Sequence, residues 1–226
     1  NNMNVVCVYY GNKYGTEYVQ KLYNMVQRHL TIPHKFYCFT DHPRMNHIIN
    51  GDILCKPFHL HDEKGWWNKM LMYSKDCGLE GPNLYLDLDV VILKNINCFA
   101  LWGDDETIGV INDFNGFNTN YNSSILKFNT SITDSAIYQK YMTDRPRYRR
   151  EQGDQNVMSM LVKNHPNVKV MPDEWSQSYK WYDRKDPRFE KGKWDFTLRP
   201  ETKICVFHGQ PNPHESEQEW VKNNWS

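Results

Sequence analysis

The chain has 226 residues, of which 39% are hydrophobic and 24% are charged. This balance excludes intrinsically disordered, collagen-like and coiled-coil chains, and the length predicts one domain with a substantial core. Lys and Arg together number 27, as do Asp and Glu, so the chain lacks the excess positive charge of a dedicated nucleic-acid-binding protein. We therefore expect a globular protein without a nucleic-acid partner.

No apolar run approaches the ~20 residues that cross a bilayer, and the first residues lack the charged-then-apolar pattern of a signal peptide. These features predict a cytoplasmic protein without a transmembrane segment. The six cysteines are scattered and include no CxxC pair. This spacing favours reduced thiols over a disulfide framework or a zinc site.

Apolar and amphipathic runs alternate through the first half of the chain. They predict strands over 3–10 and 35–40 and a third that begins the stretch over 83–93, with helices over 16–29 and 66–75. This order is typical of a mostly parallel sheet with helices on its faces. In such sheets ligands bind beyond the carboxyl ends of the strands, so the residues after the first and third strands are candidates for a site.

The second half is less regular. It predicts strands over 107–111, 124–128 and 203–207, helices over 135–142 and 155–163, and charged surface loops over 145–150 and 180–193. The basic loop over 145–150 is most simply solvated, with an anionic acceptor or membrane surface as the alternative contact.

The motif Asp87-Leu88-Asp89 carries the clearest chemical signal, since apolar runs precede and follow it. Two carboxylates one residue apart are costly to desolvate there without a cation. Oxygen ligands suit Mg²⁺ or Mn²⁺, which keep open positions for substrate phosphates. The alternative is a pair of exposed turn carboxylates, but the flanking apolar runs favour a divalent metal site.

Two further interpretations stay open. In haloacid-dehalogenase-like phosphatases an aspartate pair follows a strand and its first member is the nucleophile, which here would be Asp87 with Mg²⁺. That motif normally follows the first strand of its fold, whereas more than eighty residues precede it here. The surplus of 8 Trp and 14 Tyr also fits a non-catalytic sugar-binding module, in which the aspartates have no role.

Seven short segments occur in the order in which metal-dependent nucleotide-sugar glycosyltransferases of the GT-A fold carry them. The segments are 5–11, 39–41, 66–69, 85–89, 122–124, 153–155 and 207–214. The chain resembles the glycogenin-like and related bacterial and viral sugar transferases over nearly its whole length. The resemblance implies an α/β fold, a single GT-A domain over 1–226 with a Rossmann-like mixed sheet flanked by helices. It also implies a nucleotide-binding half over about 1–100 and a sugar and acceptor half over about 101–226.

The resemblance further implies roles for particular residues. Mn²⁺ or Mg²⁺ would be held by Asp87, Asp89 and His208. The donor nucleotide and its phosphates would contact Tyr9, Tyr10, Tyr14, Lys69, Asp87, Leu88, Ser123, Lys180, His208 and Gly209. The catalytic residues beside the transferred sugar would be Asn122, Asp154 and Gln155.

Several of these residues also have simple structural explanations. These are a polar strand cap for His208, a solvated charge for Lys69, a helix N-cap for Asp154 and a turn for Asn122 and Ser123. For Asp154, capping and sugar contact are compatible. The sequence leaves both kinds of explanation open.

The function implied by the resemblance is transfer of a sugar from a nucleoside diphosphate donor, most simply UDP-linked, to a carbohydrate or other hydroxyl acceptor. The glycogenin-like members favour retention of the anomeric configuration. Residues 210–214 lack a helix or strand pattern and include two prolines. We therefore expect the tail over 209–225 to become ordered only when the donor nucleotide and the metal are both bound.

Overall fold

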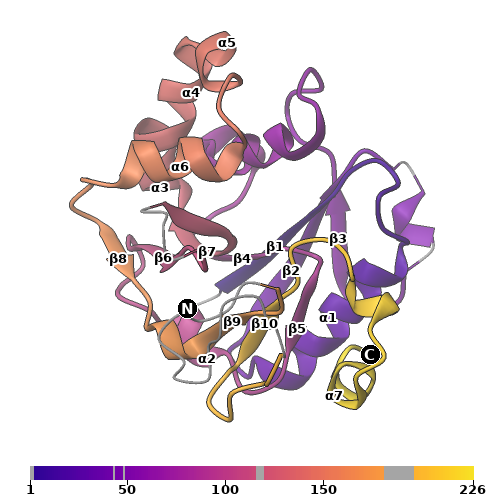
Figure 1. Cartoon of the computed structure of the whole chain (residues 1–226). Helices are drawn as coiled ribbons and strands as arrows, with labels where there is room; N and C mark the ends of the chain where they lie inside the picture. Colours follow the sequence, from indigo (N-terminus) through magenta and orange to yellow (C-terminus); the bar gives the residue numbers. More distant parts are fainter. Residues whose placement is uncertain (1–2, 43, 48, 116–119, 181–195) are drawn as a thin grey trace.

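A seven-stranded mixed sheet forms the centre of the molecule, in the order β3-β2-β1-β4-β7-β6-β8 (Figure 1). The computed structural model describes residues 3–42, 44–47, 49–115, 120–180 and 196–226. The seven strands are β1 (Met3–Tyr9), β2 (His34–Thr40), β3 (Ile53–Lys56), β4 (Pro82–Leu86), β6 (Ile108–Asn112), β7 (Tyr121–Asn129) and β8 (Val168–Val170). A smaller sheet has the order β5-β10-β9, formed by β5 (Val90–Ile92), β9 (Ser176–Ser178) and β10 (Ile204–Val206).

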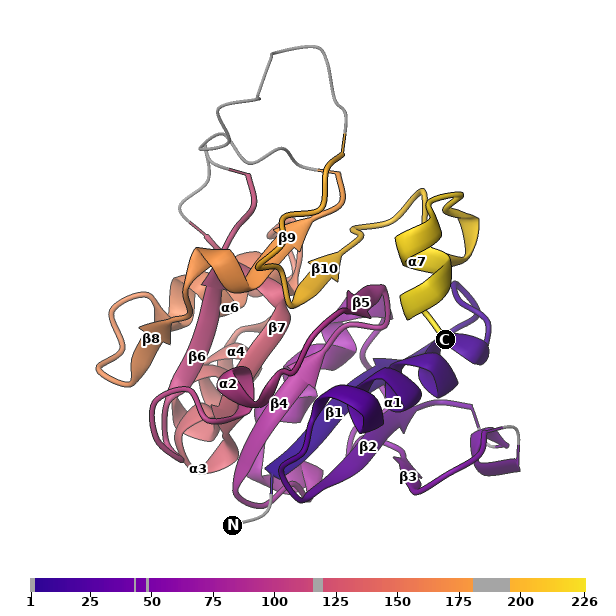
Figure 2. The same cartoon turned by 90° about the horizontal axis from the view of Figure 1, so that it is seen from below.

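Helices cover both faces of the large sheet (Figure 2). The α-helices are α1 (Glu17–His29), α2 (Asn97–Ala100), α3 (Thr130–Thr133), α4 (Gln139–Thr143), α5 (Arg145–Tyr148), α6 (Asp154–Val162) and α7 (Glu219–Asn224). The 3₁₀ segments are η1 (Met45–His47), η2 (Gly65–Tyr73), η3 (Lys75–Cys77), η5 (Asp173–Trp175) and η6 (Pro213–Glu215), and η4 (Asp134–Tyr138) is a π-helical turn. Within the described ranges, no helix combines the length and the hydropathy that crossing a membrane requires.

Four neighbouring strands, β3, β2, β1 and β4, run parallel, so their carboxyl ends lie at one edge of the sheet. Strand β7 runs antiparallel to β4 and β6 on either side of it. The near-continuous apolar run of β1 fits this position, because a central parallel strand is buried on both faces. The predicted fold class, a mixed α/β sheet flanked by helices, is confirmed.

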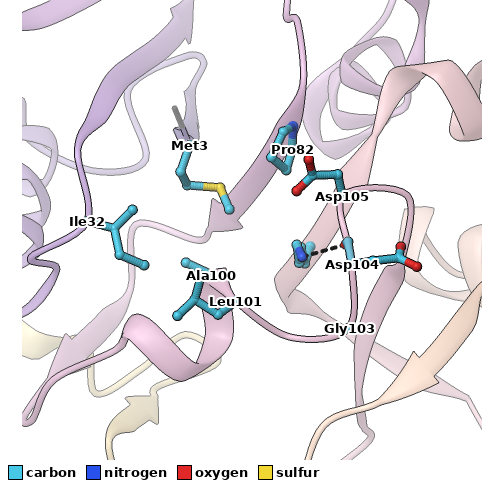
Figure 3. A pocket seen from close by; sticks show the side chains of 9 residues that line it. Met3, Ile32, Pro82, Ala100, Leu101, Gly103, Asp104 and Asp105 are labelled. Atoms are coloured by element: carbon cyan, nitrogen blue, oxygen red, sulfur yellow. Dashed lines mark hydrogen bonds between the residues drawn. The ribbon is translucent and has the colours of Figure 1, made fainter. Parts of the chain in front are cut away.

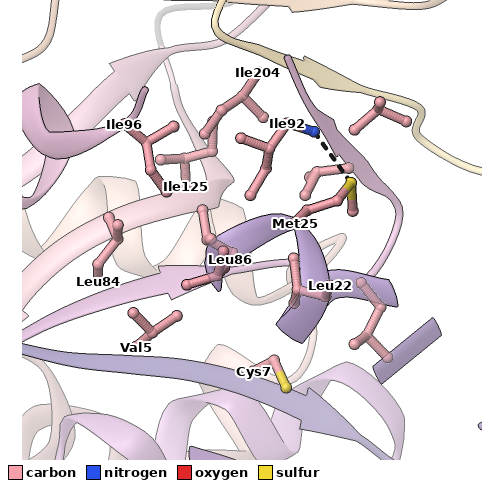
Figure 4. Close-up of a cluster of buried hydrophobic side chains, with 14 of the residues drawn as sticks. Val5, Cys7, Leu22, Met25, Leu84, Leu86, Ile92, Ile96, Ile125 and Ile204 are labelled. Atoms are coloured by element: carbon pink, nitrogen blue, oxygen red, sulfur yellow. Dashed lines mark hydrogen bonds between the residues drawn. The ribbon is translucent and has the colours of Figure 1, made fainter. Parts of the chain in front are cut away.

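Two hydrophobic clusters occupy the two faces of the sheet. On one face α1 and the smaller sheet pack over β1 and β4; Figure 4 shows Leu22 and Met25 of α1 close to Leu86. On the other face η2, η4 and α6 pack over the same strands. Side chains on opposite sides of a strand alternate, so Tyr85 enters one cluster and Leu86 enters the other.

The predicted strand at the start of 83–93 is β4, which ends before the aspartates as expected, and the apolar run after them forms β5 in the other sheet. The Asp87 N–H still donates to the Ser124 carbonyl at 2.9 Å, which extends the pairing of β4 with β7. The chain then leaves the large sheet, and Val90 pairs with Val206 of β10. Leu88 and its two aspartates therefore lie between the sheets, at the carboxyl end of β4.

The secondary structure predicted from local sequence patterns differs from the structure in three other segments. The predicted helix over 66–75 is the 3₁₀ helix η2, and the helix over 135–142 begins with the π turn η4. The predicted basic loop over 145–150 contains the short helix α5. It folds because Arg145 and Arg149 meet the fully buried carboxylate of Glu63 at 3.2 and 2.7 Å, a long-range contact that charge patterning does not reveal. The predicted loop over 180–193 lies almost entirely outside the described residues.

The C-terminal tail was expected to have little besides bound nucleotide and metal to order it, and the structure gives it packing contacts of its own. The tail forms η6 and α7 and packs on α1. Val221 is fully buried, and the Trp225 ring lies 4.8 Å from the Tyr18 ring. Arg28 of α1 donates a hydrogen bond to the Ser226 carbonyl at 2.7 Å. These aromatic and charged contacts supply the order that the proline-containing segment lacks by itself.

Candidate functional site

At the carboxyl edge of the sheet, the buried Lys69 side chain contacts residues from three different segments of the chain. Its ammonium lies 3.3 Å from carboxylate oxygens of both Asp87 and Asp154. It also donates to the Ser123 carbonyl at 3.1 Å and to the Ser123 hydroxyl at 3.2 Å. Only 9% of the Lys69 side chain is exposed, so the explanation of this residue as a solvated charge is wrong.

The local electrostatics follow from one cation shared by two carboxylates. Burial opposes the charge on Lys69, but Asp154 and Asp87 outweigh it and hold the Lys69 pKa above its ordinary value. Burial raises the pKa of Asp154, and Lys69 offsets only part of that rise. With both carboxylates ionised, the group carries one more negative than positive charge, which favours binding of a further cation.

Asp87 is positioned by two neighbours. Besides the Lys69 ammonium, the Tyr85 hydroxyl donates to it at 2.5 Å. Tyr85 was not identified as a site residue from the sequence. The alternation of side chains along a strand could have indicated this role for Tyr85. Residues two apart point to the same face, so Tyr85 shares the face of Asp87 at the end of β4. Leu88 points to the opposite face and is buried in the core, which leaves only its backbone available for contact with a donor.

Asp89 lies at the start of β5, against the C-terminal segment. Its carboxylate accepts long hydrogen bonds, each 3.4 Å, from the Tyr14 hydroxyl and the Gly209 N–H. The Phe207 N–H donates to the Asp89 carbonyl at 3.0 Å, which brings residues 118 positions apart in the chain side by side. Burial, and then the charge of Asp87, raise the pKa of Asp89.

His208 follows β10 in a left-handed backbone conformation, with φ of 55°. Its Nε2 atom is buried and has no hydrogen-bond partner among the described residues. Burial lowers the His208 pKa to about 4, so the imidazole is neutral at pH 7, which is the form that ligates metals. The Lys180 ammonium donates to the His208 carbonyl at 3.1 Å. Left-handed backbone of a residue other than glycine is costly, and a buried ring nitrogen without a partner needs a reason, so both features point to a functional role.

The described residues contain no group of three His, Cys, Asp or Glu side chains already arranged to hold a metal ion. The predicted ligands nevertheless come from adjoining segments, since Asp89 contacts the residues on both sides of His208. The unpartnered Nε2 of His208 and the surplus negative charge fit a divalent cation. Lys69 and Tyr85 both contact Oδ1 of Asp87, so the other carboxylate oxygen is the one through which Asp87 would hold such an ion.

The predicted sugar-contacting residues lie next to this group. Asn122 and Ser123 belong to β7, so their explanation as a turn is wrong. Gln155 accepts a hydrogen bond from the Ser123 N–H at 3.1 Å and donates to Asp113 at 3.3 Å. Asp154 is the first residue of α6 rather than its N-cap, and its carboxylate faces Lys69. Asp113 is a further neighbour that no sequence motif indicated.

The predicted base-binding tyrosines differ in accessibility. Tyr9 is buried, and its hydroxyl donates to the Tyr14 carbonyl at 2.8 Å. Tyr10 is half-buried and stacks on Phe58, and Tyr14 is half-buried with its hydroxyl toward Asp89. The ends of β1 and β2 meet at this place, where the Gly11 N–H donates to Asp41 at 3.3 Å. Tyr10 and Tyr14 are thus the rings still available to a nucleobase.

A cavity of about 280 Å³ lies at the opposite edge of the sheet (Figure 3). It opens beside Met3 and Pro82, the first residues of β1 and β4, and is also lined by Leu101, Asp104 and Asp105. None of the predicted site residues lines it. The candidate site is therefore separate from this cavity.

Solved structures with the same architecture include glycosyltransferases. The glycosyltransferase GlyE of Streptococcus pneumoniae superposes with a TM-score of 0.72 at 18% identity, covering 98% of this chain and 60% of that chain. The galactosyltransferase LgtC, solved with donor and acceptor sugar analogs, gives a TM-score of 0.64 at 13% identity, covering 99% of this chain and 96% of that chain. An active-site mutant of LgtC superposes with a TM-score of 0.67 at 13% identity, covering 97% of this chain and 93% of that chain.

No protein-family model and no curated protein matches the sequence. At these low identities the likeness to solved structures establishes the fold, which is of the GT-A type expected from the sequence motifs. The chain spans less than two thirds of the length of GlyE.

Proposed function

We propose that this chain is a metal-dependent glycosyltransferase that moves a sugar from a nucleoside diphosphate donor, most simply UDP-linked, to a hydroxyl of a carbohydrate or similar acceptor. The observation that carries the proposal is the buried group of Lys69, Asp87 and Asp154 beside Asp89 and His208, at the carboxyl edge of a GT-A type sheet. Ligands of open α/β sheets bind at this edge.

The proposed donor lies along the sheet edge in the order of the strands. The base sits at the ends of β1 and β2, near Tyr10 and Tyr14. The diphosphate lies at the end of β4, where Asp87, Asp89 and His208 would hold Mn²⁺ or Mg²⁺. The sugar reaches β7 and the start of α6, where Asn122, Asp154 and Gln155 accept or donate hydrogen bonds to its hydroxyls.

A divalent ion, when bound, would neutralise charge that develops on the departing diphosphate. In the transfer, a bond forms between the acceptor oxygen and the anomeric carbon, and the bond from that carbon to the diphosphate oxygen breaks with its electron pair. The acceptor hydroxyl proton passes to the leaving diphosphate. Lys69 and Lys180 add positive charge near the same phosphates, and the buried Asp154 lies where positive charge develops on the sugar.

The decisive experiment is titration of the protein with UDP by calorimetry, with and without Mn²⁺, followed by assays of a panel of UDP-sugars for metal-dependent hydrolysis. Asp89→Ala should lose the Mn²⁺-dependent component while keeping its circular dichroism spectrum. Asp105→Ala, at the opposite edge of the sheet, is the matched control and should retain it. UDP binding that is indifferent to Mn²⁺, or full activity of Asp89→Ala, would contradict the proposal. For a panel sugar that is transferred, NMR of the new anomeric centre tests the expected retention.

The phosphatase interpretation is not favoured, since the fold matches glycosyltransferases. In the structure Asp87 is also paired with Lys69 and Tyr85 rather than left free as a nucleophile. A sugar-binding module without catalysis gives no role to the buried Lys69 group. Trapping of a phosphorylated aspartate in the wild-type protein, lost in Asp87→Asn, would restore the phosphatase interpretation.

A further inference from the structure

Trp66 is an exposed aromatic side chain beside the candidate site. Its exposed fraction is 57%, whereas the adjacent Trp67 packs in a stacked arrangement on Tyr141, with ring centroids 6.1 Å apart. The other exposed large hydrophobic side chains among the described residues are aliphatic: Leu54, Leu101, Met160 and Val170. An exposed indole has no packing role to explain it, and tryptophan contributes the largest contact area of any side chain to a ligand.

The backbone of η2 aims Trp66 toward the site. In a 3₁₀ helix, side chains three residues apart lie one above the other, so Trp66 stands over the turn that carries Lys69. A side-chain carbon placed on Gly153 would lie 3.6 Å from the Trp66 indole nitrogen. The indole thus lies beside Gly153, immediately before Asp154 at the start of α6. Trp66 makes no hydrogen bond within the described part of the chain, which leaves its N–H available to a ligand.

The start of η2 is also held in place. The Asn68 side chain donates to the Gly65 carbonyl at 3.0 Å, and Glu63 is fixed by Arg145 and Arg149. The backbone that carries Trp66 is thus held by these contacts, so less conformational entropy is lost when a ligand binds there.

The order of the strands separates two parts of the site: the edge along which the proposed donor lies, and the region past the transferred sugar, next to the start of α6. The proposed donor extends from β1 through β4 to β7, and the neighbouring element is α6, whose first residue is Asp154. Trp66 meets the chain at Gly153, on the side of α6 that the donor reaches last. Trp66 is exposed to solvent there, so a second substrate can reach the proposed sugar from this side.

We propose that Trp66 is the stacking platform for the acceptor, and that the acceptor is a saccharide with a pyranose ring. This inference rests on the proposed function. One face of a pyranose presents mainly C–H groups, which match the apolar face of an indole, and its rim presents hydroxyls. With the ring on Trp66, a hydroxyl edge faces Asp154 and Gln155, beside the sugar to be transferred.

The test measures saccharide binding to the full chain in the presence of UDP and Mn²⁺, with lactose, maltose, methyl β-galactoside and methyl β-glucoside as probes. Indole N–H resonances are followed by NMR, and the Trp66 signal is assigned by its absence in Trp66→Phe. At least one probe should shift that signal. Trp66→Ala should weaken binding of that probe roughly tenfold, the loss expected of one aromatic contact, and Trp66→Phe should weaken it less.

Leu101→Ala is the matched control, because Leu101 is 65% exposed at the opposite edge of the sheet, and it should bind the probe as the wild type does. The inference is overturned if no probe shifts the Trp66 resonance, or if Trp66→Ala binds as tightly as the wild type. A Trp66 response in a protein whose UDP binding ignores Mn²⁺ would refute the metal-dependent transferase and leave the saccharide platform standing.

Discussion

Replacing Lys69 by methionine tests the electrostatic account of the site. The substitution keeps the length of the side chain and removes its charge. Each Lys69–carboxylate pair at 3.3 Å corresponds to about 5 kcal/mol of attraction at an effective dielectric constant of about 20, before the cost of burying the ions. Because that cost offsets much of the attraction, we expect a loss of about 3–5 kcal/mol in the free energy of unfolding, the usual result of removing one partner of a buried pair.

The same substitution should make stability depend on pH in a defined direction. Burial already raises the Asp154 pKa above its unfolded value, and loss of Lys69 removes the charge that opposes this rise. A carboxyl group with a raised folded-state pKa stabilises the fold when protonated and loses that contribution as pH rises through the folded-state pKa. The destabilisation caused by Lys69→Met should therefore be smaller at pH 5 than at pH 8.

Urea unfolding followed by circular dichroism at the two pH values measures both effects. Lys140→Met is the control, because Lys140 is exposed on α4 and its charge is solvated. A destabilisation below about 1 kcal/mol, the level of a surface ion pair, would refute the buried-pair account. An equal loss at pH 5 and pH 8 would show that Asp154 does not carry the uncompensated charge.

The remaining predictions concern the metal ligand, the tail and the buried carboxylate. His208→Ala should weaken Mn²⁺-dependent UDP binding by about 1–3 kcal/mol in calorimetry, and unchanged binding would make the histidine a strand cap. Trp225→Ala should accelerate amide hydrogen exchange throughout α7 in the ligand-free protein; if α7 exchanges rapidly in the wild type, its packing on α1 is not as described. Glu63→Gln should lower the free energy of unfolding by about 1.5–3 kcal/mol, the range for hydrogen bonds to a charged group, and a neutral effect would argue against its pairing with Arg145.

Much of the architecture follows from local patterns in the chain. The apolar run of β1 and the amphipathic run of α1 lie within two residues of their predicted bounds, because burial on two faces or on one face leaves a distinct periodicity. The Asp87-Leu88-Asp89 motif was recognisable because carboxylates between two apolar runs need an electrostatic partner. Its place at the carboxyl edge follows from the strand before it.

The sequence does not show which charged side chains from distant segments pair with one another in the fold. Lys69 is 85 positions from Asp154 along the chain, yet their charged atoms lie 3.3 Å apart because η2 and α6 pack on the same face of the sheet. The basic segment over 145–150 was expected to be solvated for the same reason, since no local pattern reveals its pairing with the distant Glu63. The C-terminal segment lacked a helical signal and became ordered through its contacts with α1.

The sequence by itself indicated most of the strands, the main helices and their order, and it marked the aspartate motif as a candidate metal site, since those inferences depend on residues close together in the chain. Only the tertiary structure decided that Lys69 is shared by Asp87 and Asp154, and that the His208 ring nitrogen is buried without a partner. It also decided that Trp66, rather than Trp67, remains exposed. The physical reason is that burial and charge pairing depend on which surfaces meet when the helices and loops pack on the sheet, and that information is distributed over the whole chain.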